Sequence, residues 1–170
     1  TIELGAWNKL YRRSFLTANN LEFITDFCAG EGLQFITLAA SKANCVTVGQ
    51  KKVYHYRTDN ATSATTKPDV ERQGIGAITT MQYICEHLDL SNPKVRKAYN
   101  WRLWSTYGYC LRQIIATHQE HVYRDLLRTC IHHRRSLALP MIAADISMKR
   151  KIIALLTFIS PTVVAKLSLR

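Results

Sequence analysis

The sequence predicts an α+β fold that is mainly helical, with short strands and helices at residues 1–67 followed by a helical region at residues 68–170. Beyond residue 69, apolar residues recur at the spacing that places them on one face of a helix. Before residue 58, two short runs are rich in β-branched and aromatic residues, as strands are. The chain is 47% hydrophobic and 21% charged, which is ordinary for a globular domain with a buried core.

The helices expected in the first region are short. Ser14 opens a helical turn that ends at the turn-favouring pair Asn19 and Asn20. After Gly32, apolar residues at helical spacing predict an amphipathic helix that stops near Asn44.

Two strands are expected after this helix. Residues 45–48 (Cys-Val-Thr-Val) and 53–56 (Val-Tyr-His-Tyr) have the composition of strands and are separated by residues that suit a turn. Residues 58–68 contain almost nothing apolar, so they predict a long polar loop, a usual place for binding groups.

Helices are expected throughout the second region. An apolar stripe runs through residues 75–88, and Asn92 before Pro93 is typical of a helix start. The long helix that follows has one apolar face, and its pattern is expected to break before it resumes around Leu126.

The charge of the chain is strongly positive and uneven. The 23 Lys and Arg residues exceed the 12 Asp and Glu residues, which gives a net charge of +11. Residues 86–170 hold 14 of the basic and 5 of the acidic side chains, a net of +9. A basic half of this kind indicates an anionic partner such as a membrane surface, a phosphate-bearing substrate or nucleic acid.

The five cysteines are an odd number without a C-x-x-C pair, which indicates neither a disulfide framework nor a zinc knuckle. Reduced and mostly buried thiols are expected, which fits a cytosolic location. The chain starts at Thr1 without an initiator methionine or a secretory leader, so we expect it to be cut from a longer protein.

The histidines do not predict a metal site. His118 and His121 would share a helix face, but they do not follow the H-E-x-x-H order, and no third ligand is evident. We expect these side chains and the adjacent pair His132 and His133 to lie at the surface or partly buried.

The C-terminal segment joins a basic cluster to an apolar run. Lys149, Arg150 and Lys151 precede residues 152–165, which are too few to span a bilayer and include Pro161. This composition is typical of a helix that lies in an anionic membrane interface, so the three basic residues are candidate membrane contacts. The alternative is a terminal helix packed on its own core.

Candidate functional residues occur in several short stretches of the first region. Residues 7–16 combine Trp7, Lys9 and paired arginines, which could stack on a ligand and bind an anion. The alternative is that the apolar and aromatic residues of this stretch belong to the core and its charges face solvent. Glu31 follows Gly30 at an expected helix start, where a carboxylate is favoured by the helix dipole whether or not it is catalytic. Arg57, beside several hydroxyl side chains, could hold a phosphate, or it could belong to an exposed edge strand.

In their order along the chain, these stretches resemble the C-terminal half of a bacterial family-two glycosyltransferase with a GT-A fold. The matching pieces are residues 7–16, 31–35, 54–57 and 60–66. The resemblance implies that residues 1–67 are the acceptor-side C-terminal part of a GT-A catalytic domain and residues 68–170 a basic helical C-terminal region. It further implies a nucleotide-sugar donor and a cell-surface polysaccharide or lipid-linked acceptor at the inner face of the cell membrane.

The resemblance also places much of the active site outside this chain. The nucleotide-sugar site and its Asp-x-Asp motif, which binds Mg²⁺ or Mn²⁺ in the intact enzyme, would lie upstream, so the fragment alone would be inactive. Glu31 matches the first acid of the family's Glu-Asp pair, whereas Gly32 stands where the family usually has the catalytic base. Either Glu31 or Asp26 then replaces that base, or the catalytic machinery is altered.

The remaining assignments follow from the same resemblance. Trp7 and Lys9 match positions on the acceptor side of the site, and Arg57 and Ser63 match the loop that closes over the donor phosphates.

The alternative function is a non-catalytic, basic helical module that binds an anionic membrane or nucleic acid. Nucleic acid is disfavoured because no helix-turn-helix, finger or aromatic sheet motif is present. Aromatic residues are spread around the helix expected at residues 99–109, and some of them must pack on a neighbouring surface, either within this protein or in a homo-oligomer.

Overall fold

The computed structural model describes residues 5–24, 29–49, 51, 54–55, 57, 59, 67–142 and 146–169. Within these residues the chain is mainly helical and no strand is present. The elements, in chain order, are α1 (Arg13–Ala18), α2 (Glu31–Lys42), the π-helix η1 (Val70–Ile75), α3 (Gly76–His87), α4 (Pro93–Ala116), α5 (Arg124–Ser136), α6 (Ala138–Ile142), α7 (Met148–Ile159) and α8 (Pro161–Leu167).

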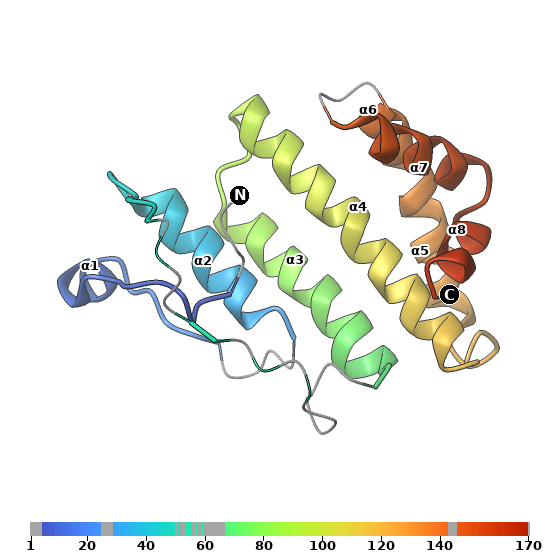
Figure 1. Ribbon diagram of the computed structural model, residues 1–170, viewed down its shortest axis with the longest axis horizontal. Coiled ribbons are helices and arrows are strands. Elements are labelled where there is room, and N and C mark those ends of the chain that lie inside the picture. The colour runs from blue at the N-terminus through green and yellow to red at the C-terminus, as the bar shows by residue number, and fades with distance from the viewer. Residues whose placement is uncertain are drawn as a thin grey trace.

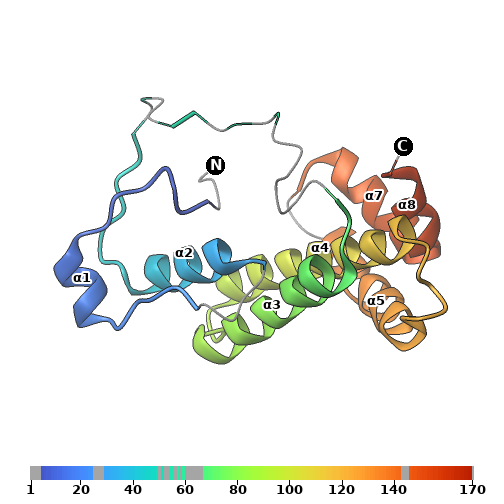
Figure 2. The same ribbon diagram turned by 90° about the horizontal axis from the view of Figure 1, so that it is seen from below.

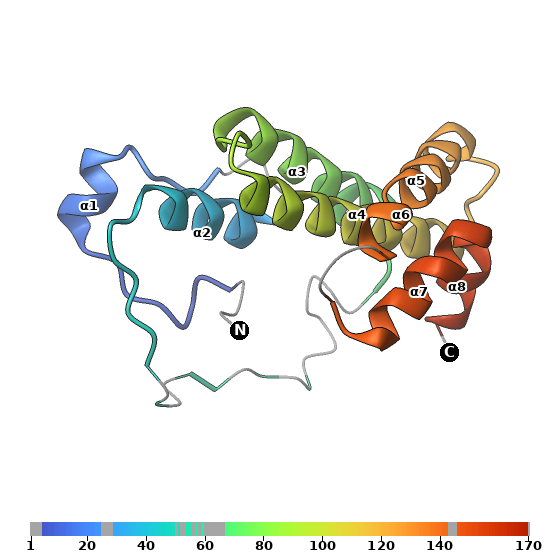
Figure 3. The ribbon, with the colours of Figure 1, turned by 90° about the horizontal axis from the view of Figure 1, so that it is seen from above.

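The long helix α4 is the centre of the arrangement. Helices α2, α3 and α4 lie side by side, and α5, α7 and α8 gather at the end of the molecule opposite α1 (Figures 1 and 2). Helix α4 packs against η1, α3, α5 and α8, and α6 and α7 lie beside each other (Figure 3).

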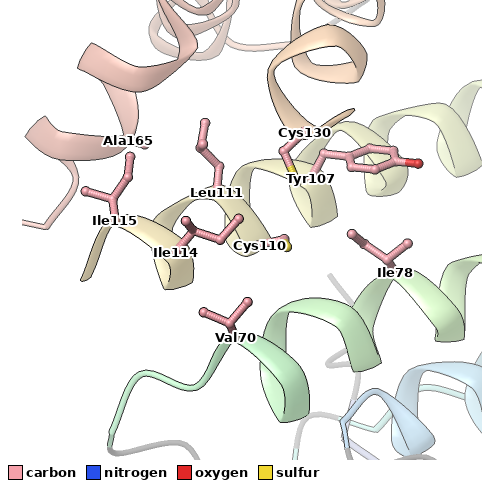
Figure 4. Close-up of a cluster of buried hydrophobic side chains, with 9 residues drawn as sticks. All are labelled: Val70, Ile78, Tyr107, Cys110, Leu111, Ile114, Ile115, Cys130 and Ala165. Atoms are coloured by element: carbon pink, nitrogen blue, oxygen red, sulfur yellow. The ribbon is translucent and has the colours of Figure 1, made fainter. Parts of the chain in front are cut away.

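The main core cluster surrounds the carboxyl-terminal half of α4. Leu111 and Ile114 are fully buried, and side chains from η1, α3, α5 and α8 close over them (Figure 4). A separate cluster between α2 and the chain before it contains Leu21, Phe35 and Leu38. A further cluster joins Trp104 to α6 and α7.

The helix boundaries expected from the sequence are largely confirmed. Asn92 Oδ1 accepts a hydrogen bond from the Lys94 amide (2.9 Å), and Pro93 is the first residue of α4. Helix α1 ends before Asn20, which adopts φ 50°, a left-handed conformation that asparagine tolerates. The long helical pattern breaks between α4 and α5, as expected.

The two expected strands are wrong for the residues that the structure describes. Residues 45–49 form no regular element, and Val46 and Val48 are 57% and 67% exposed. Tyr54 and His55 also lie outside any strand, whereas Val53 and Tyr56 fall outside the described residues. Their β-branched and aromatic side chains favour extended backbone, but a strand also needs a paired neighbour to bury them.

The cysteines and histidines differ in part from the expectation. Cys110 and Cys130 are free and buried in the main core, but Cys45 and Cys85 are free and exposed. His118 and His121 lie in the turn between α4 and α5 and not on one helix face.

Among the described residues, no helix is long and apolar enough to cross a membrane.

Candidate functional site

Aromatic contacts connect the stretches that the sequence singles out. The rings of Trp7 and Tyr54 lie 5.9 Å apart between centroids, tilted by 36°, and each residue is 49% exposed. A Cβ atom on Gly5 would overlap the Trp7 ring, so the chain before the ring packs tightly against it. Residues 7–16 are therefore held next to the Tyr54 segment, and the two rings remain partly open to a ligand.

A second aromatic group ties residues 7–16 to α2. The Tyr11 ring meets Phe35 edge to face at 5.1 Å, and Phe23 stacks on Phe35 at 4.2 Å. Burial raises the pKa of the Tyr11 phenol, whose hydroxyl is buried without a hydrogen-bond partner among the described residues. The three stretches around Trp7, Phe35 and Tyr54 therefore form one connected region.

Glu31 is the first residue of α2, and its position is fixed by the chain before it. Gly30 has φ 94°, a left-handed conformation that favours glycine, and a Cβ atom there would lie 2.6 Å from Thr80 Oγ1. Thr80 Oγ1 donates a hydrogen bond to the carbonyl oxygen of Ala29 (2.8 Å), which anchors this turn on α3. The carboxylate of Glu31 is exposed in the first turn of the helix, where the macrodipole favours a negative charge.

The basic candidates of the first region interact locally. Lys9 Nζ donates hydrogen bonds to Gly5 O (2.7 Å) and Asn8 Oδ1 (2.6 Å). Arg57 Nε donates to Asp59 Oδ1 at 2.9 Å, and both side chains are more than 70% exposed. An exposed pair of this kind contributes little stability, so Arg57 is accessible to an anionic ligand.

The candidate catalytic and binding residues are only partly brought together. Trp7 joins the Tyr54 segment, but in the described part of the chain no hydrogen bond or ion pair connects Glu31 with Arg57. Asp26 and Ser63 lie outside the described residues.

No group of three His, Cys, Asp or Glu side chains that could hold a metal occurs in the part that the structure describes. The resemblance places the ligands of its divalent metal mostly outside this chain, so that expectation stays a prediction.

The candidate membrane contacts at the start of α7 point in different directions. Lys149 is exposed and Lys151 half-buried, whereas the Arg150 guanidinium carbon lies 5.1 Å from the centre of the Trp101 ring. Arg150 therefore faces α4 in a cation–π contact, and Lys149 and Lys151 remain on the flanks of the helix.

The sequence analysis missed a pocket of about 420 Å³ between α5, α6 and α7. Its lining combines cationic, polar and apolar side chains, namely Arg128, Ile131, His132, Arg135, Ser136, Leu139 and Phe158. The signal in the sequence is the spacing of the polar group, because residues 128, 132, 135 and 136 fall on one face of a helix.

Comparison with protein-family models, curated protein sequences and solved structures finds no significant match to this chain.

Proposed function

We propose that this chain is the acceptor-side part of a glycosyltransferase that moves a sugar from a nucleotide-sugar donor to a cell-surface polysaccharide or lipid-linked acceptor. The observation that carries the proposal is the connected aromatic region, because the contacts Trp7–Tyr54 and Tyr11–Phe35 join three of the four stretches that resemble such enzymes. If the three stretches resembled these enzymes only by chance, nothing would require them to meet in space.

The exposed faces of Trp7 and Tyr54 suit the binding of a sugar acceptor. Sites for small molecules combine aromatic walls with a few polar groups that fix the orientation of the ligand. Asn8 and Lys9 provide polar groups directly beside the Trp7 ring in the chain. In this proposal the rings hold the apolar face of a sugar and the polar side chains bind its hydroxyls.

Glu31 is the proposed base for the acceptor. Its carboxylate would take the proton of an acceptor hydroxyl while the oxygen forms a bond to the anomeric carbon of the donor sugar and the bond to the nucleoside diphosphate breaks. Positive side chains such as Arg57 would stabilise the charge of the departing diphosphate. The proposed location is cytoplasmic, peripheral at the inner face of the cell membrane.

The test uses the longest gene product that contains this chain. Release of nucleoside diphosphate is measured with a panel of nucleotide sugars and sugar acceptors. The proteins compared are the unaltered protein, Glu31→Gln and Glu22→Gln, the last at an exposed acid outside the stretches that resemble the family. We expect Glu31→Gln to lower turnover by about 100-fold or more, as loss of a general base does, and Glu22→Gln to leave it unchanged. Equal turnover in both variants removes Glu31 from the mechanism.

A second measurement tests the class of the protein directly. Titration calorimetry with the same nucleotide sugars reports binding whether or not a suitable acceptor is present. Absence of both binding and diphosphate release would contradict the glycosyltransferase proposal. The second candidate, a non-catalytic basic module, then takes its place, because residues 86–170 carry the net charge of +9 that favours an anionic surface.

A further inference from the structure

Helices α7 and α8 both expose large apolar side chains. On α7, Ile152 is 52% exposed and Ile159 is 64% exposed, and on α8 Leu167 is 57% exposed. The apolar face consists of Met148, Ile152, Leu155, Leu156, Ile159, Val163 and Leu167. Both helices lie at the end of the molecule away from α1, with α7 packed on α5, α6 and α8 (Figure 1).

The opposite side of each helix is fixed to the protein by small buried residues. Ala154 and Thr157 of α7 are fully buried, as is the side chain of Pro161, and Ala165 of α8 is 5% exposed. Thr157 Oγ1 accepts a hydrogen bond from Arg134 Nη2 (3.2 Å), which sets the rotation of α7 about its axis. The apolar face therefore cannot turn inward without breaking this packing.

The charges around the apolar face favour an anionic surface over a second copy of this chain. Residues 146–169 contain Lys149, Arg150, Lys151 and Lys166 and no acidic residue. A second copy would bring the same positive charges into contact, whereas anionic headgroups next to the acyl region of a bilayer complement both the apolar face and its basic flanks.

The pocket between α5, α6 and α7 adjoins this face. Phe158, 43% exposed on α7, lines the pocket, and Arg135 Nη2 donates a hydrogen bond to the carbonyl oxygen of Ile159 (3.2 Å). The guanidinium of Arg135 has further N–H donors. Arg128 makes a 3.4 Å contact with the exposed Asp125, and such exposed pairs are weak. Two arginines beside apolar walls suit a phosphate that is joined to a hydrocarbon chain.

Building on the membrane location proposed above, we propose that the apolar face lies in the interface of an anionic bilayer and that the α5–α7 pocket binds the phosphate of a phospholipid headgroup. The phosphate accepts hydrogen bonds from Arg128 and Arg135. The acyl chains of the same lipid contact Phe158 and the apolar face.

The test measures binding of the longest gene product to vesicles by co-sedimentation. Vesicles of phosphatidylcholine alone are compared with vesicles in which about one third of the lipid is phosphatidylglycerol. We expect binding to the anionic vesicles to be at least about tenfold tighter, because both the pocket and the flanking lysines select negative headgroups. Equal binding to both vesicles, or no binding to either, would overturn the proposal.

Two pairs of variants separate the apolar face from the pocket. Leu155→Glu with Ile159→Glu is expected to weaken binding to the anionic vesicles by about tenfold or more. His121→Glu with Val122→Glu, at exposed sites in the α4–α5 turn, adds the same two acidic side chains and is the matched control. The double variant Arg128→Gln with Arg135→Gln is expected to weaken vesicle binding more than the control Arg72→Gln with Arg124→Gln. The control removes the same charge from exposed sites outside the pocket. Equal losses within either comparison would contradict the assigned site. Circular dichroism checks that each variant retains its helices.

The remaining outcomes distinguish this proposal from the proposed enzyme. Sedimentation that shows a dimer, lost in Leu155→Glu with Ile159→Glu, would assign the apolar face to a second copy and overturn the membrane proposal. Binding to anionic vesicles without diphosphate release or nucleotide-sugar binding would support the membrane site and contradict only the enzyme.

Discussion

At the scale of single residues, Arg134 shows how a buried cation joins helices. It is 7% exposed, its Nη1 donates to the Trp104 carbonyl (2.9 Å), and its guanidinium lies 3.7 Å from the centre of the Trp104 ring. Burial and, to a smaller extent, the charge of Arg112 lower the pKa of Arg134 to about 10. Its bond to Thr157 extends the contact to α7, so one side chain connects α4, α5 and α7.

The guanidinium of Arg134 packs closely against Gly108 of α4. A Cβ atom on Gly108 would lie 2.7 Å from Arg134 Cζ, so Gly108→Ala must displace this side chain. Alanine gains about 1 kcal/mol of helix propensity over glycine, but overpacking costs about 1–3 kcal/mol, so we expect a net loss of about 1 kcal/mol in the free energy of unfolding. Urea denaturation measures this change.

A second helical glycine serves as the control for Gly108→Ala. A Cβ atom on Gly76 would lie 3.5 Å from its nearest neighbour, an ordinary contact. Gly76→Ala should therefore leave stability unchanged or raise it by up to about 1 kcal/mol. The packing explanation fails if the two substitutions shift the urea midpoint in the same direction by similar amounts.

His133 makes stability depend on pH. Its ring stacks on Tyr107 at 4.3 Å, and burial, followed by the charge of His132, lowers the pKa of His133 below its usual 6.5. The unfolded chain therefore takes up a proton near pH 6.5, before the folded protein does. This contribution to stability is complete above pH 6.5 and decreases as the pH falls from there toward the lower folded pKa.

Substitution of His133 tests this dependence. Urea midpoints measured between about pH 5 and pH 7.5 should decline less steeply toward acid for His133→Gln than for the unaltered protein. The variant His121→Gln, at an exposed position, provides the comparison. An unchanged slope in His133→Gln would rule out this residue as the source.

At the scale of elements, helices with local signals were predictable and elements that depend on distant contacts were not. Helix α4 begins at Pro93, after the cap residue Asn92, because a capping side chain and a proline both act on the backbone next to them. The start of η1 also has a local signal, because Asp69 Oδ1 accepts a hydrogen bond from the Arg72 amide (2.8 Å). Its π-helical form has none and coincides with a close approach to α4, where a Cβ atom on Gly74 would be 3.0 Å from Cys110 Sγ. The expected strand at residues 45–48 was wrong, because composition alone cannot supply a pairing partner.

The same reasoning explains the candidate sites. Glu31 at a helix start follows from Gly30 and the apolar pattern after it, so its position was predictable. The contact between Trp7 and Tyr54 joins residues far apart in the chain, and no local pattern specifies it. The direction of Arg150, toward Trp101, likewise depends on how α7 rotates when Ala154 and Thr157 pack inward.

The cap of α4 is a direct test at this scale. Asn92→Ala removes the acceptor for the Lys94 amide and is expected to lower the free energy of unfolding by about 1 kcal/mol. Asn44→Ala, at an exposed position beyond the end of α2, should change it by less than about 0.5 kcal/mol. Thermal denaturation followed by circular dichroism compares the two, and equal shifts would contradict the capping role.

At the scale of the whole molecule, the separation of the hydrophobic clusters predicts unequal local stability. Helix α4 packs against η1, α3, α5 and α8, whereas α2 packs mainly against α3. The cluster around Phe35 is also distinct from the one around Ile114. A region with fewer packed neighbours opens more readily than the central core, so we expect α2 amides to exchange with solvent faster than those of α4.

Two core substitutions turn this expectation into a test of cooperativity. Phe35→Ala removes the ring on which Tyr11 and Phe23 pack and should cost about 3 kcal/mol or more, felt mainly as faster hydrogen exchange in α2. Ile114→Ala, in the central cluster, should accelerate exchange in α4 and in α2 together, because α2 depends on α3 and α3 on α4. Native-state hydrogen exchange followed by mass spectrometry resolves both helices. If Phe35→Ala accelerates hydrogen exchange in α4 as much as in α2, the two clusters unfold as one unit. The aromatic region then has no independent stability, and every binding assay on its variants needs a control for global unfolding.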